Sequence, residues 1–451
     1  MKKILSVLLV LLIMLAVLSV GIGGWNAPAM AAGPTIVQIA AGSHHTLALL
    51  SDGSIYSWGY NMYGQLGDGT CTDRKTPVKI GTGFIAIAAG GGHSLALKGN
   101  DLYAWGENGD GQLGDGTNYE RDTPVKIGTG YTAIAAGGFY SLALKGNTLY
   151  AWGANNKGQL GDGTNTNRNK PVRIGTGYTA IAPGWTHSLA LKGNILYAWG
   201  DNDYNQLGNG TNIGQNTPVK IGTGYTDIST KAAHSLALKG DTLYSWGLNE
   251  DGQLGDGTNI NRSKPIKIGT GYTAIATGGG HSLALKGNVL YVWGWNDFGQ
   301  LGDGTNIGKN KPIKIVTSYS AIAAGARQSF ALNGNTLFAW GSNEMGELGD
   351  GTNTDRNKPT IVKLPGTSTS PTSVKLDKAT VNMVVGKSIT LKATVIPSNA
   401  DQKVTWSSSD KAVATVSSDG VVKGIKVGTA TITVKTVNGK TAKCVVTVNK
   451  K

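Results

Sequence analysis

Cysteine is nearly absent from this 451-residue chain, which contains only Cys71 and Cys444. Two cysteines exclude the disulfide framework that stabilises many small secreted domains, so stability must come from buried apolar cores. With 40% apolar residues, the chain is long enough to bury more than one core. The two cysteines fall in different predicted domains, and we expect no disulfide between them.

Long apolar runs are also missing, with one exception at the N-terminus. Lys2 and Lys3 precede an apolar run over residues 4–20, and small residues including Ala29-Met30-Ala31 follow. This pattern predicts a secretory signal peptide over residues 1–32 that is cleaved near Ala31. The alternative is an uncleaved anchor, because a spanning helix needs roughly 18 apolar residues. We therefore expect a bacterial protein that is secreted or exposed at the cell surface.

Acidic residues are scarce at the other end of the chain. Residues 373–451 contain thirteen Lys and four Asp, a formal charge of +9 out of +14 for the whole chain. In the repeats, the lysines of "KGN" and "PVKI" are scattered singly, without the basic stripe of a nucleic-acid-binding protein. Nucleic acid is therefore not an expected partner. We interpret the basic tail as a solvated surface, with weak contact to anionic wall polymers as the alternative.

Glycine, in contrast, is abundant and regularly placed. The heptapeptide "GQLGDGT" occurs at residues 64–70, 111–117, 158–164, 252–258 and 299–305, with altered copies starting at Asn205 and Gly346. Neighbouring copies start 47 residues apart, a period that is typical of solenoids, propellers and arrays. Each unit has alternating apolar residues and Gly-Asn hairpin turns, and no helical periodicity. Each unit is therefore predicted to be a sheet of four short antiparallel strands.

Seven such units cover residues 35–363, and we predict that residues 33–363 form a seven-bladed β-propeller. The chain enters at "IVQIAAG" and leaves at "PTIV". We interpret these ends as two partial units that complete one blade and close the ring. The glycines of the heptapeptide are expected to supply positive φ and close approach to the next blade. Its Asp is expected to hydrogen-bond within its own turn.

The repeat has the form "GGxHSLAL…LYAWGxNxxGQLGDGT…PVKI", which resembles the regulator-of-chromosome-condensation repeat family. That resemblance implies a seven-bladed propeller and covers all seven units. WD-type repeats fit less well, because every blade has Trp-Gly and no Trp-Asp dipeptide occurs. Eukaryotic members of the family can activate a small nuclear GTPase. An exported chain would not meet one, so no small GTPase is expected as a partner.

A second domain follows the Pro/Ser/Thr-rich linker "LPGTSTSPTS" at residues 364–373. Short β-rich runs separated by Gly, Asn, Asp and Ser predict a small β-sandwich over residues 374–449. The segment resembles the bacterial group 2 Ig-like domain, with Trp406 as its core aromatic residue. This resemblance implies a spacer or attachment module. The fold class of the whole chain is therefore all-β, with a propeller and an Ig-like sandwich.

Three polar patterns of the repeats could indicate a chemical function. Five blades have a His at one position, and these residues are His45, His93, His187, His234 and His281. A ring of imidazoles could bind a metal ion, but packing of each His against its own turn explains the pattern as well. Adjacent His-Ser pairs suggest a nucleophile and base, but successive strand residues point to opposite faces and are not expected to meet. The GDGT loops do not have the spacing of known calcium loops. No catalytic residue, metal or cofactor is predicted.

The repeats differ most on one side of the predicted propeller. In an up-and-down blade, the "GGxH" connection and the connection after Trp-Gly share one face, and the "KGN" hairpin lies on the other. Large residues accumulate on the first face, where exposed aromatic side chains are usual interface anchors. Drift in solvent loops is the alternative interpretation. The predicted partner-binding residues are His44, Tyr60, Tyr63, Phe139, Tyr140, Trp185, Tyr204, Trp295, Phe298 and Arg327.

These features favour an exported, non-enzymatic binding protein whose propeller presents one variable face to an extracellular protein or a cell-surface glycan. The alternative is a structural cell-surface building block without a specific ligand. An enzyme ranks third, because no carboxylate pair or nucleophile constellation is recognised as departing from the repeat.

The signal peptide gives the first testable prediction. The intact mass of the secreted protein should correspond to a chain that begins near Ala32, because the small residues before it form the cleavage site. A membrane-bound product that still begins at Met1 would contradict this prediction.

Overall fold

The computed structural model describes residues 33–450 except 368–370, 372 and 397–399. The predicted signal peptide and part of the predicted linker lie outside the described residues. The described residues form strands, turns and irregular segments. They include no helix that could cross a membrane.

The first four blades are sheets of four antiparallel strands each. Blade 1 contains β1 (Ile36–Ala41), β2 (His45–Leu50), β3 (Ile55–Gly59) and β4 (Arg74–Gly81). Blade 2 contains β5 (Ala86–Ala89), β6 (His93–Lys98), β7 (Asp101–Gly106) and β8 (Arg121–Thr129). Blade 3 contains β9 (Ala133–Ala136), β10 (Tyr140–Lys145), β11 (Thr148–Gly153) and β12 (Arg168–Thr176). Blade 4 contains β13 (Ala180–Pro183), β14 (His187–Lys192), β15 (Ile195–Gly200) and β16 (Gln215–Thr223).

The last three blades have the same order. Blade 5 contains β17 (Asp227–Thr230), β18 (His234–Lys239), β19 (Thr242–Gly247) and β20 (Arg262–Gly269). Blade 6 contains β21 (Ala274–Thr277), β22 (His281–Lys286), β23 (Val289–Gly294) and β24 (Lys309–Ser318). Blade 7 contains β25 (Ala321–Ala324), β26 (Gln328–Asn333), β27 (Thr336–Gly341) and β28 (Arg356–Val362). The first strands of neighbouring blades pack against each other and form the inner ring.

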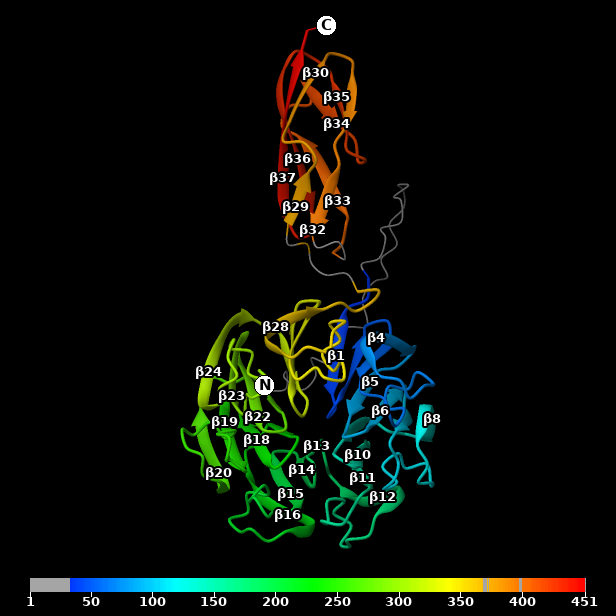
Figure 1. Ribbon diagram of the computed structural model, residues 1–451, viewed down its shortest axis with the longest axis vertical. Coiled ribbons are helices and arrows are strands. Elements are labelled where there is room, and N and C mark those ends of the chain that lie inside the picture. The colour runs from blue at the N-terminus through cyan, green and yellow to red at the C-terminus, as the bar shows by residue number, and fades with distance from the viewer. Residues whose placement is uncertain (1–32, 368–370, 372, 397–399, 451) are drawn as a thin grey trace, which may run out of the picture. The chain divides into compact units, whose positions relative to one another are not determined.

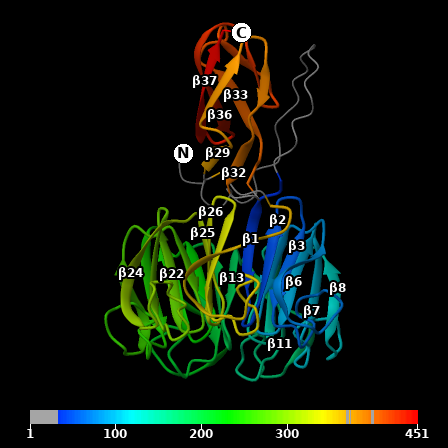
Figure 2. The same ribbon diagram turned by 45° about the horizontal axis from the view of Figure 1, so that its top comes forward.

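The ring closes without a shared blade, so the predicted complementation of two partial units is wrong. Every blade consists of consecutive strands, and β1 of blade 1 packs against β25 of blade 7. The blue first blade and the yellow last blade lie side by side in Figures 1 and 2. The interpretation failed because "IVQIAAG" begins a complete first unit and "PTIV" ends a complete seventh unit. Closure therefore depends on side-to-side contacts, such as the hydrogen bond from Ile36 N to Asn335 Oδ1 at 2.7 Å.

One hydrogen-bond pattern joins the blades at every interface. The indole Nε1 of Trp105 in blade 2 donates to the backbone carbonyl of Gln65 in blade 1 at 2.9 Å, and the Ser94 hydroxyl donates to the same oxygen at 2.8 Å. The closing interface repeats this pattern, because Trp58 and Thr46 both donate to the carbonyl of Glu347. The corresponding indole bonds of the other five blades are made by Trp152, Trp199, Trp246, Trp293 and Trp340.

The hydrogen bond between the indole of one blade and the carbonyl of the blade before it explains why the heptapeptide recurs. Gly67 has φ of 77°, and a Cβ at this position would lie 2.6 Å from the Trp105 indole nitrogen, so only glycine lets the next blade approach. Leu66 is fully buried in the blade. The predicted turn bond of Asp68 is also present, because Asp68 Oδ1 accepts from Thr70 N and from Thr70 Oγ1. The outer carboxylate oxygen accepts from Arg74, a partner that sequence analysis missed.

The C-terminal part is a β-sandwich, as predicted. One sheet has the strand order β30 (Thr380–Val384), β37 (Thr441–Asn449), β36 (Gly428–Thr436) and β33 (Val404–Ser408). A second has the order β31 (Ser388–Thr390), β35 (Val421–Gly424) and β34 (Ala414–Val416), and β29 (Ser373–Leu376) pairs with β32 (Ala393–Ile396). Trp406 is half-buried against the core that contains Ile432, Val446 and Cys444. Both cysteine thiols are free, with Cys71 exposed and Cys444 buried.

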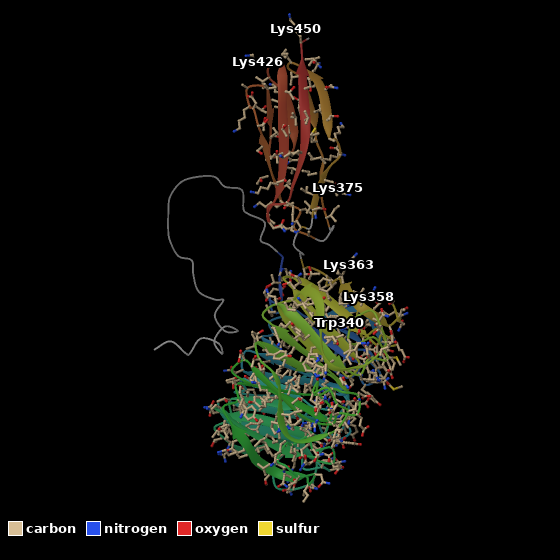
Figure 3. The ribbon with its side chains drawn as sticks, turned by 90° about the vertical axis from the view of Figure 1, so that its left-hand side faces the viewer. Trp340, Lys358, Lys363, Lys375, Lys426 and Lys450 are labelled. Atoms are coloured by element: carbon tan, nitrogen blue, oxygen red, sulfur yellow. The ribbon has the colours of Figure 1, made fainter. Side chains whose placement is uncertain are left out.

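The lysines of the sandwich lie on its surface. Figure 3 shows the side chains of Lys426 and Lys450 at one end of this domain and that of Lys375 at the other, whereas Trp340 lies within its propeller blade. All three lysines are exposed, and none takes part in an ion pair among the described residues. The basic charge of this domain is therefore spread over its surface.

The close approach of the indole predicts unequal effects on stability at two positions of one loop. Changing Gly208 to Ala should lower the free energy of unfolding by about 2–4 kcal/mol, because the new Cβ would lie 2.6 Å from the Trp246 indole nitrogen at a φ of 74°. Asn205 has φ of 65°, and its side chain makes no hydrogen bond to any residue that the structure describes, so changing Asn205 to Gly should alter stability by less than about 1 kcal/mol. Urea denaturation of both variants measures this difference. Equal effects would show that indole approach does not require glycine.

Candidate functional site

The predicted variable face is assembled from two connections per blade. Tyr60 N donates to the carbonyl of His44 at 2.8 Å, which joins the connection after the first strand to the connection after the third strand. On the opposite face, Tyr131 N donates to the carbonyl of Asn100 at 3.0 Å and joins the other two connections. We call the first side the variable face: the β1–β2 and β3–β4 connections and their equivalents in the other six blades.

The predicted partner-binding residues differ in exposure. Trp185 and Tyr204 are exposed, with 38% and 44% of their surface accessible. Seven more are half-buried: His44, Tyr60, Tyr63, Phe139, Trp295, Phe298 and Arg327. These nine residues all belong to connections of the variable face, where they were predicted to lie.

Tyr140 is fully buried, so its prediction as a contact residue is wrong. It begins strand β10, and its hydroxyl lies 2.6 Å from the carbonyl of His187 and 2.8 Å from Ser188 Oγ in the next blade. Burial raises the pKa of this phenol above its usual range. Tyr140 therefore joins two blades and takes the place that His has in five others.

The exposed and half-buried residues gather in separate groups. Phe139 of blade 3 and Trp185 of blade 4 meet edge to face, with ring centroids 5.3 Å apart. Trp295 and Phe298 of blade 6 form a second pair at 5.2 Å, and the Arg327 guanidinium of blade 7 lies 4.8 Å from the Phe298 ring centre. These ring contacts do not connect the two groups to each other. The face therefore offers several aromatic anchors instead of one.

A third group lies where the ring closes. The rings of His44 and Tyr60 are 6.4 Å apart, and those of Tyr60 and Tyr63 are 6.2 Å apart. His44 Nδ1 also lies 3.2 Å from the Oε1 atom of Glu347, which replaces the usual Gln of the heptapeptide. His44 is thereby tied to the last blade.

The histidine column is structural. His93 Nε2 lies 2.9 Å from Ser141 Oγ of the next blade, and the Ser141 hydroxyl donates to the carbonyl of Gln112. The histidine must then carry its proton on Nε2 and donate it to Oγ. Adjacent His and Ser residues of one strand do not pair, as expected: His93 meets Ser141, and Ser94 donates to the carbonyl of Gln65. Among the described residues, no three His, Cys, Asp or Glu side chains converge to hold a metal ion.

Sequence analysis missed the acidic residues of the variable face. Glu250 and Asp251 of blade 5 and Asp297 of blade 6 line one cleft with Trp295. Burial raises the pKa of Asp251, and the negative charges of Asp297 and Glu250 raise it further. In blade 2, burial raises the pKa of Glu107 to about 7. The premise that no carboxylate pair departs from the repeat is therefore wrong. The signal lay in the residue before and the two residues after the Asn of Trp-Gly-x-Asn.

Two further features were also missed. Three consecutive blades expose an Ile at one position of the connection before the fourth strand, with accessible fractions of 62–66%; these residues are Ile213, Ile260 and Ile307. Lys231 of blade 5 stands where six blades have Gly, and its Nζ reaches across the ring to the carbonyls of Ala41 at 2.6 Å and Ala89 at 3.3 Å. Burial lowers the pKa of Lys231 to about 8. An aligned comparison of the seven units reveals both departures.

Comparisons with known proteins agree with this architecture. Residues 24–238 match the RCC1-like domain, and residues 241–285, 288–332 and 335–378 match the regulator of chromosome condensation (RCC1) repeat. Residues 371–446 match the bacterial Ig-like domain, group 2. The crystal structure of Prp20p from Saccharomyces cerevisiae superposes with a TM-score of 0.64 at 27% identity, covering 70% of this chain and 87% of Prp20p.

Two curated relatives share shorter segments. The kappa-carrageenase of Pseudoalteromonas carrageenovora is 51% identical over 87 residues, 19% of this chain and 22% of that protein. The 3-O-alpha-D-galactosyl-alpha-L-arabinofuranosidase of Bifidobacterium longum subsp. longum is 44% identical over 78 residues, 17% of this chain and 7% of that protein. The chain thus spans less than a quarter of either relative.

The buried histidines predict acid sensitivity. Burial lowers the pKa of His281 from 6.5 to about 3, so between these values the unfolded chain takes up a proton that the folded chain rejects. The contribution of neutral His281 to the free energy of unfolding is therefore complete above pH 6.5 and is lost as the pH falls toward 3. Wild type loses stability between pH 8 and pH 5. Changing His281 to Tyr, the residue that blade 3 has at this position, should make that loss about 2 kcal/mol smaller. Urea denaturation at both pH values measures this, and parallel losses in variant and wild type would contradict it.

Proposed function

Because this chain belongs to the RCC1-repeat propellers and carries a group 2 bacterial Ig-like domain, we propose that it is an exported, non-enzymatic binding protein. Its variable face takes an extracellular protein or a cell-surface glycan. The Ig-like domain serves as a spacer or attachment module. A small GTPase is not a proposed partner, because the proposed export separates the chain from the nucleus.

The observation that carries this proposal is the chemistry of the variable face. The connections hold the Phe139–Trp185 pair and the Trp295–Phe298 pair, and Trp185 is exposed although a soluble loop gains nothing from an exposed indole. The opposite face has the repeated "KGN" hairpins instead. There the lysine amines lie over tyrosine rings, as Lys192 lies 4.3 Å from the Tyr178 ring centre. Large aromatic side chains on a rigid support are the usual anchors of interfaces.

Glycan is the better supported of the two partner classes. Two bacterial relatives are named as enzymes that act on glycans, although each shares only a short segment with this chain. The face also combines aromatic rings with carboxylates and amides, which hydrogen-bond to hydroxyl groups. A structural building block without a ligand stays the alternative, and it predicts that the aromatic residues are dispensable.

The carboxylates of blades 5 and 6 favour glycoside hydrolysis as a second candidate function. A carboxyl whose pKa is raised, beside other carboxylates, is the arrangement of a general acid and its partner, and Asp251 has such neighbours. Release of reducing ends from a bound oligosaccharide would establish it in place of simple binding.

Removal of the anchors should separate binding from stability. The full chain is immobilised, and its affinity is measured for surface glycans and surface proteins isolated from bacterial and host cells. Changing Trp185 or Trp295 to Ala should weaken the strongest interaction about thirtyfold, equivalent to about 2 kcal/mol, because the rings lie on a preformed support. The free energy of unfolding should change by less than about 1 kcal/mol.

Asn194 provides the control on the opposite face, because it is exposed in its hairpin and its side chain makes no hydrogen bond within the described part of the chain. Changing Asn194 to Ala should leave affinity and stability unchanged. Strongly lowered melting temperatures of the Trp variants would mean that these rings belong to the core. Unchanged affinity and unchanged melting would support the building-block alternative.

A further inference from the structure

The variable face has an open cleft of about 470 Å³ between blades 5 and 6. Its walls include the side chains of Glu250, Asp251, Asn259, Trp295 and Asp297, together with those of two lysines, Lys309 and Lys311. The volume lies in the range of sites for small organic molecules. The walls combine one aromatic ring with several hydrogen-bonding groups, which is the composition expected of a site for a polar ligand.

The cleft exists because blade 6 lacks a side chain that other blades have. In blade 3, Asn167 precedes the fourth strand, and its Nδ2 donates to Asp110 Oδ1 of blade 2 at 2.8 Å. Its Oδ1 also accepts from Asn155 N at 2.8 Å. Three repeats later, Gly308 stands in the place of Asn167, and Asp251 stands in the place of Asp110. Asp251 therefore faces the cleft without the amide that satisfies its counterpart.

A second departure concerns the cations beside the cleft carboxylates, which are Lys309 and Lys311. In five blades an Arg begins the fourth strand and pairs with the Asp of its own GDGT loop, as Arg262 pairs with Asp256. Blade 6 has Lys309 there, and its Nζ lies 4.0 Å from Asp303 Oδ2. Lys309 is thus directed to its own loop. No ion pair in the described part of the chain involves Glu250, Asp251 or Asp297.

The aromatic wall lies directly beside the carboxylate of Asp251. Gly280 has no side chain, and the point that its Cβ would occupy is 3.2 Å from Trp295 Cβ and 3.3 Å from Asp251 Oδ2. Phe298 contacts the Trp295 ring edge to face and holds it in place. A ligand in the cleft can therefore lay an apolar face on Trp295 while its polar groups meet Asp251.

We propose that this cleft binds one or two units of a saccharide, with amino sugars preferred to neutral sugars and acidic sugars excluded. The proposal rests on the binding function proposed above and names the ligand class of one site on that face. Sugar hydroxyls donate to the carboxylates and to the side-chain oxygen of Asn259, and the C–H face of the ring covers Trp295. The three carboxylates outnumber the two lysines of the lining, so a protonated amine is favoured and a uronate or sulfate is disfavoured.

The natural difference between blades 3 and 6 supplies the decisive variant. Changing Gly308 to Asn should restore the amide that blade 3 has, engage Asp251 and fill the cleft. Gly308 does not have a positive φ, and its Cβ would lie 3.1 Å from the carbonyl of Gly294. The matched control is Gly214→Asn in blade 4, where the Cβ would lie 3.0 Å from the carbonyl of Gly200 and the facing residue of blade 3 is Lys157.

Calorimetric titration of the full chain uses three tetrasaccharides of equal length: β-1,4-linked glucosamine, cellotetraose and tetragalacturonate. We expect affinity in this order, with no measurable binding of the galacturonate. Gly308→Asn should weaken binding of the first two at least tenfold, and Gly214→Asn should leave it unchanged, with melting temperatures that match in the two variants. Asp251→Asn should reduce the preference for glucosamine over cellotetraose, because it removes charge and keeps the shape.

Several results would overturn the proposal. They are equal effects of the two glycine variants, tighter binding of the galacturonate, or binding of tetralysine without binding of any tetrasaccharide. If the tetrasaccharides do not bind while Trp185→Ala still weakens the surface partner, the cleft assignment fails and the proposed function stands. If neither effect is seen, both fail. Reducing-end release from the bound tetrasaccharides, lost in Asp251→Asn, would show that the cleft recognises a saccharide and also cleaves it.

Discussion

The indole-to-carbonyl hydrogen bond between neighbouring blades is the interaction on which the propeller depends. Each blade offers one backbone carbonyl, that of Gln65 or its equivalent, and the following blade donates to it both an indole N–H and a hydroxyl. These groups are fully buried, so an unpaired partner would cost far more than one ordinary hydrogen bond contributes. The bond also requires Gly67, because any Cβ there would displace the indole. The ring closes on the same bond, between Trp58 and Glu347, without exchange of a strand.

The hydrogen bonds that join the blades lie inside each interface, so the connections of the variable face can differ from blade to blade. The GDGT loop is stabilised by its own Asp and Arg, and in blade 4 both charges are replaced together by Asn209 and Gln215. Substitutions outside the inter-blade hydrogen bonds and the GDGT loop alter the chemistry of the surface without disturbing the packing of the blades. Blade 6 illustrates this, because the loss of one side chain at Gly308 opens a cleft while the Trp293 and Trp340 bonds on its two sides persist.

Buried polar groups fix how neighbouring blades align with each other. A chain of donors runs from the imidazole of His45 to the hydroxyl of Ser94 and on to the carbonyl of Gln65, so two blades meet in one arrangement only. Burial keeps the imidazole neutral by lowering the pKa of His45 to about 3. Tyr140 meets the same need with a phenol. Lys231 adds a bond across the ring from blade 5 to blades 1 and 2.

Local pattern and spacing were enough to predict the propeller, its seven blades, the C-terminal β-sandwich and the side on which the repeats differ, because period and strand alternation are properties of neighbouring residues. Aromatic residues of the connections were identified in the same way, and Trp185 and Tyr204 are indeed exposed. The burial of Tyr140, the partnership of His93 with Ser141 and the absence of a shared blade depend on contacts between residues about one repeat apart or at opposite ends of the chain. The cleft at Asp251 required tertiary structure most of all, because it arises from a side chain that is missing in the next blade, and only the packing of two blades shows what that side chain would have touched.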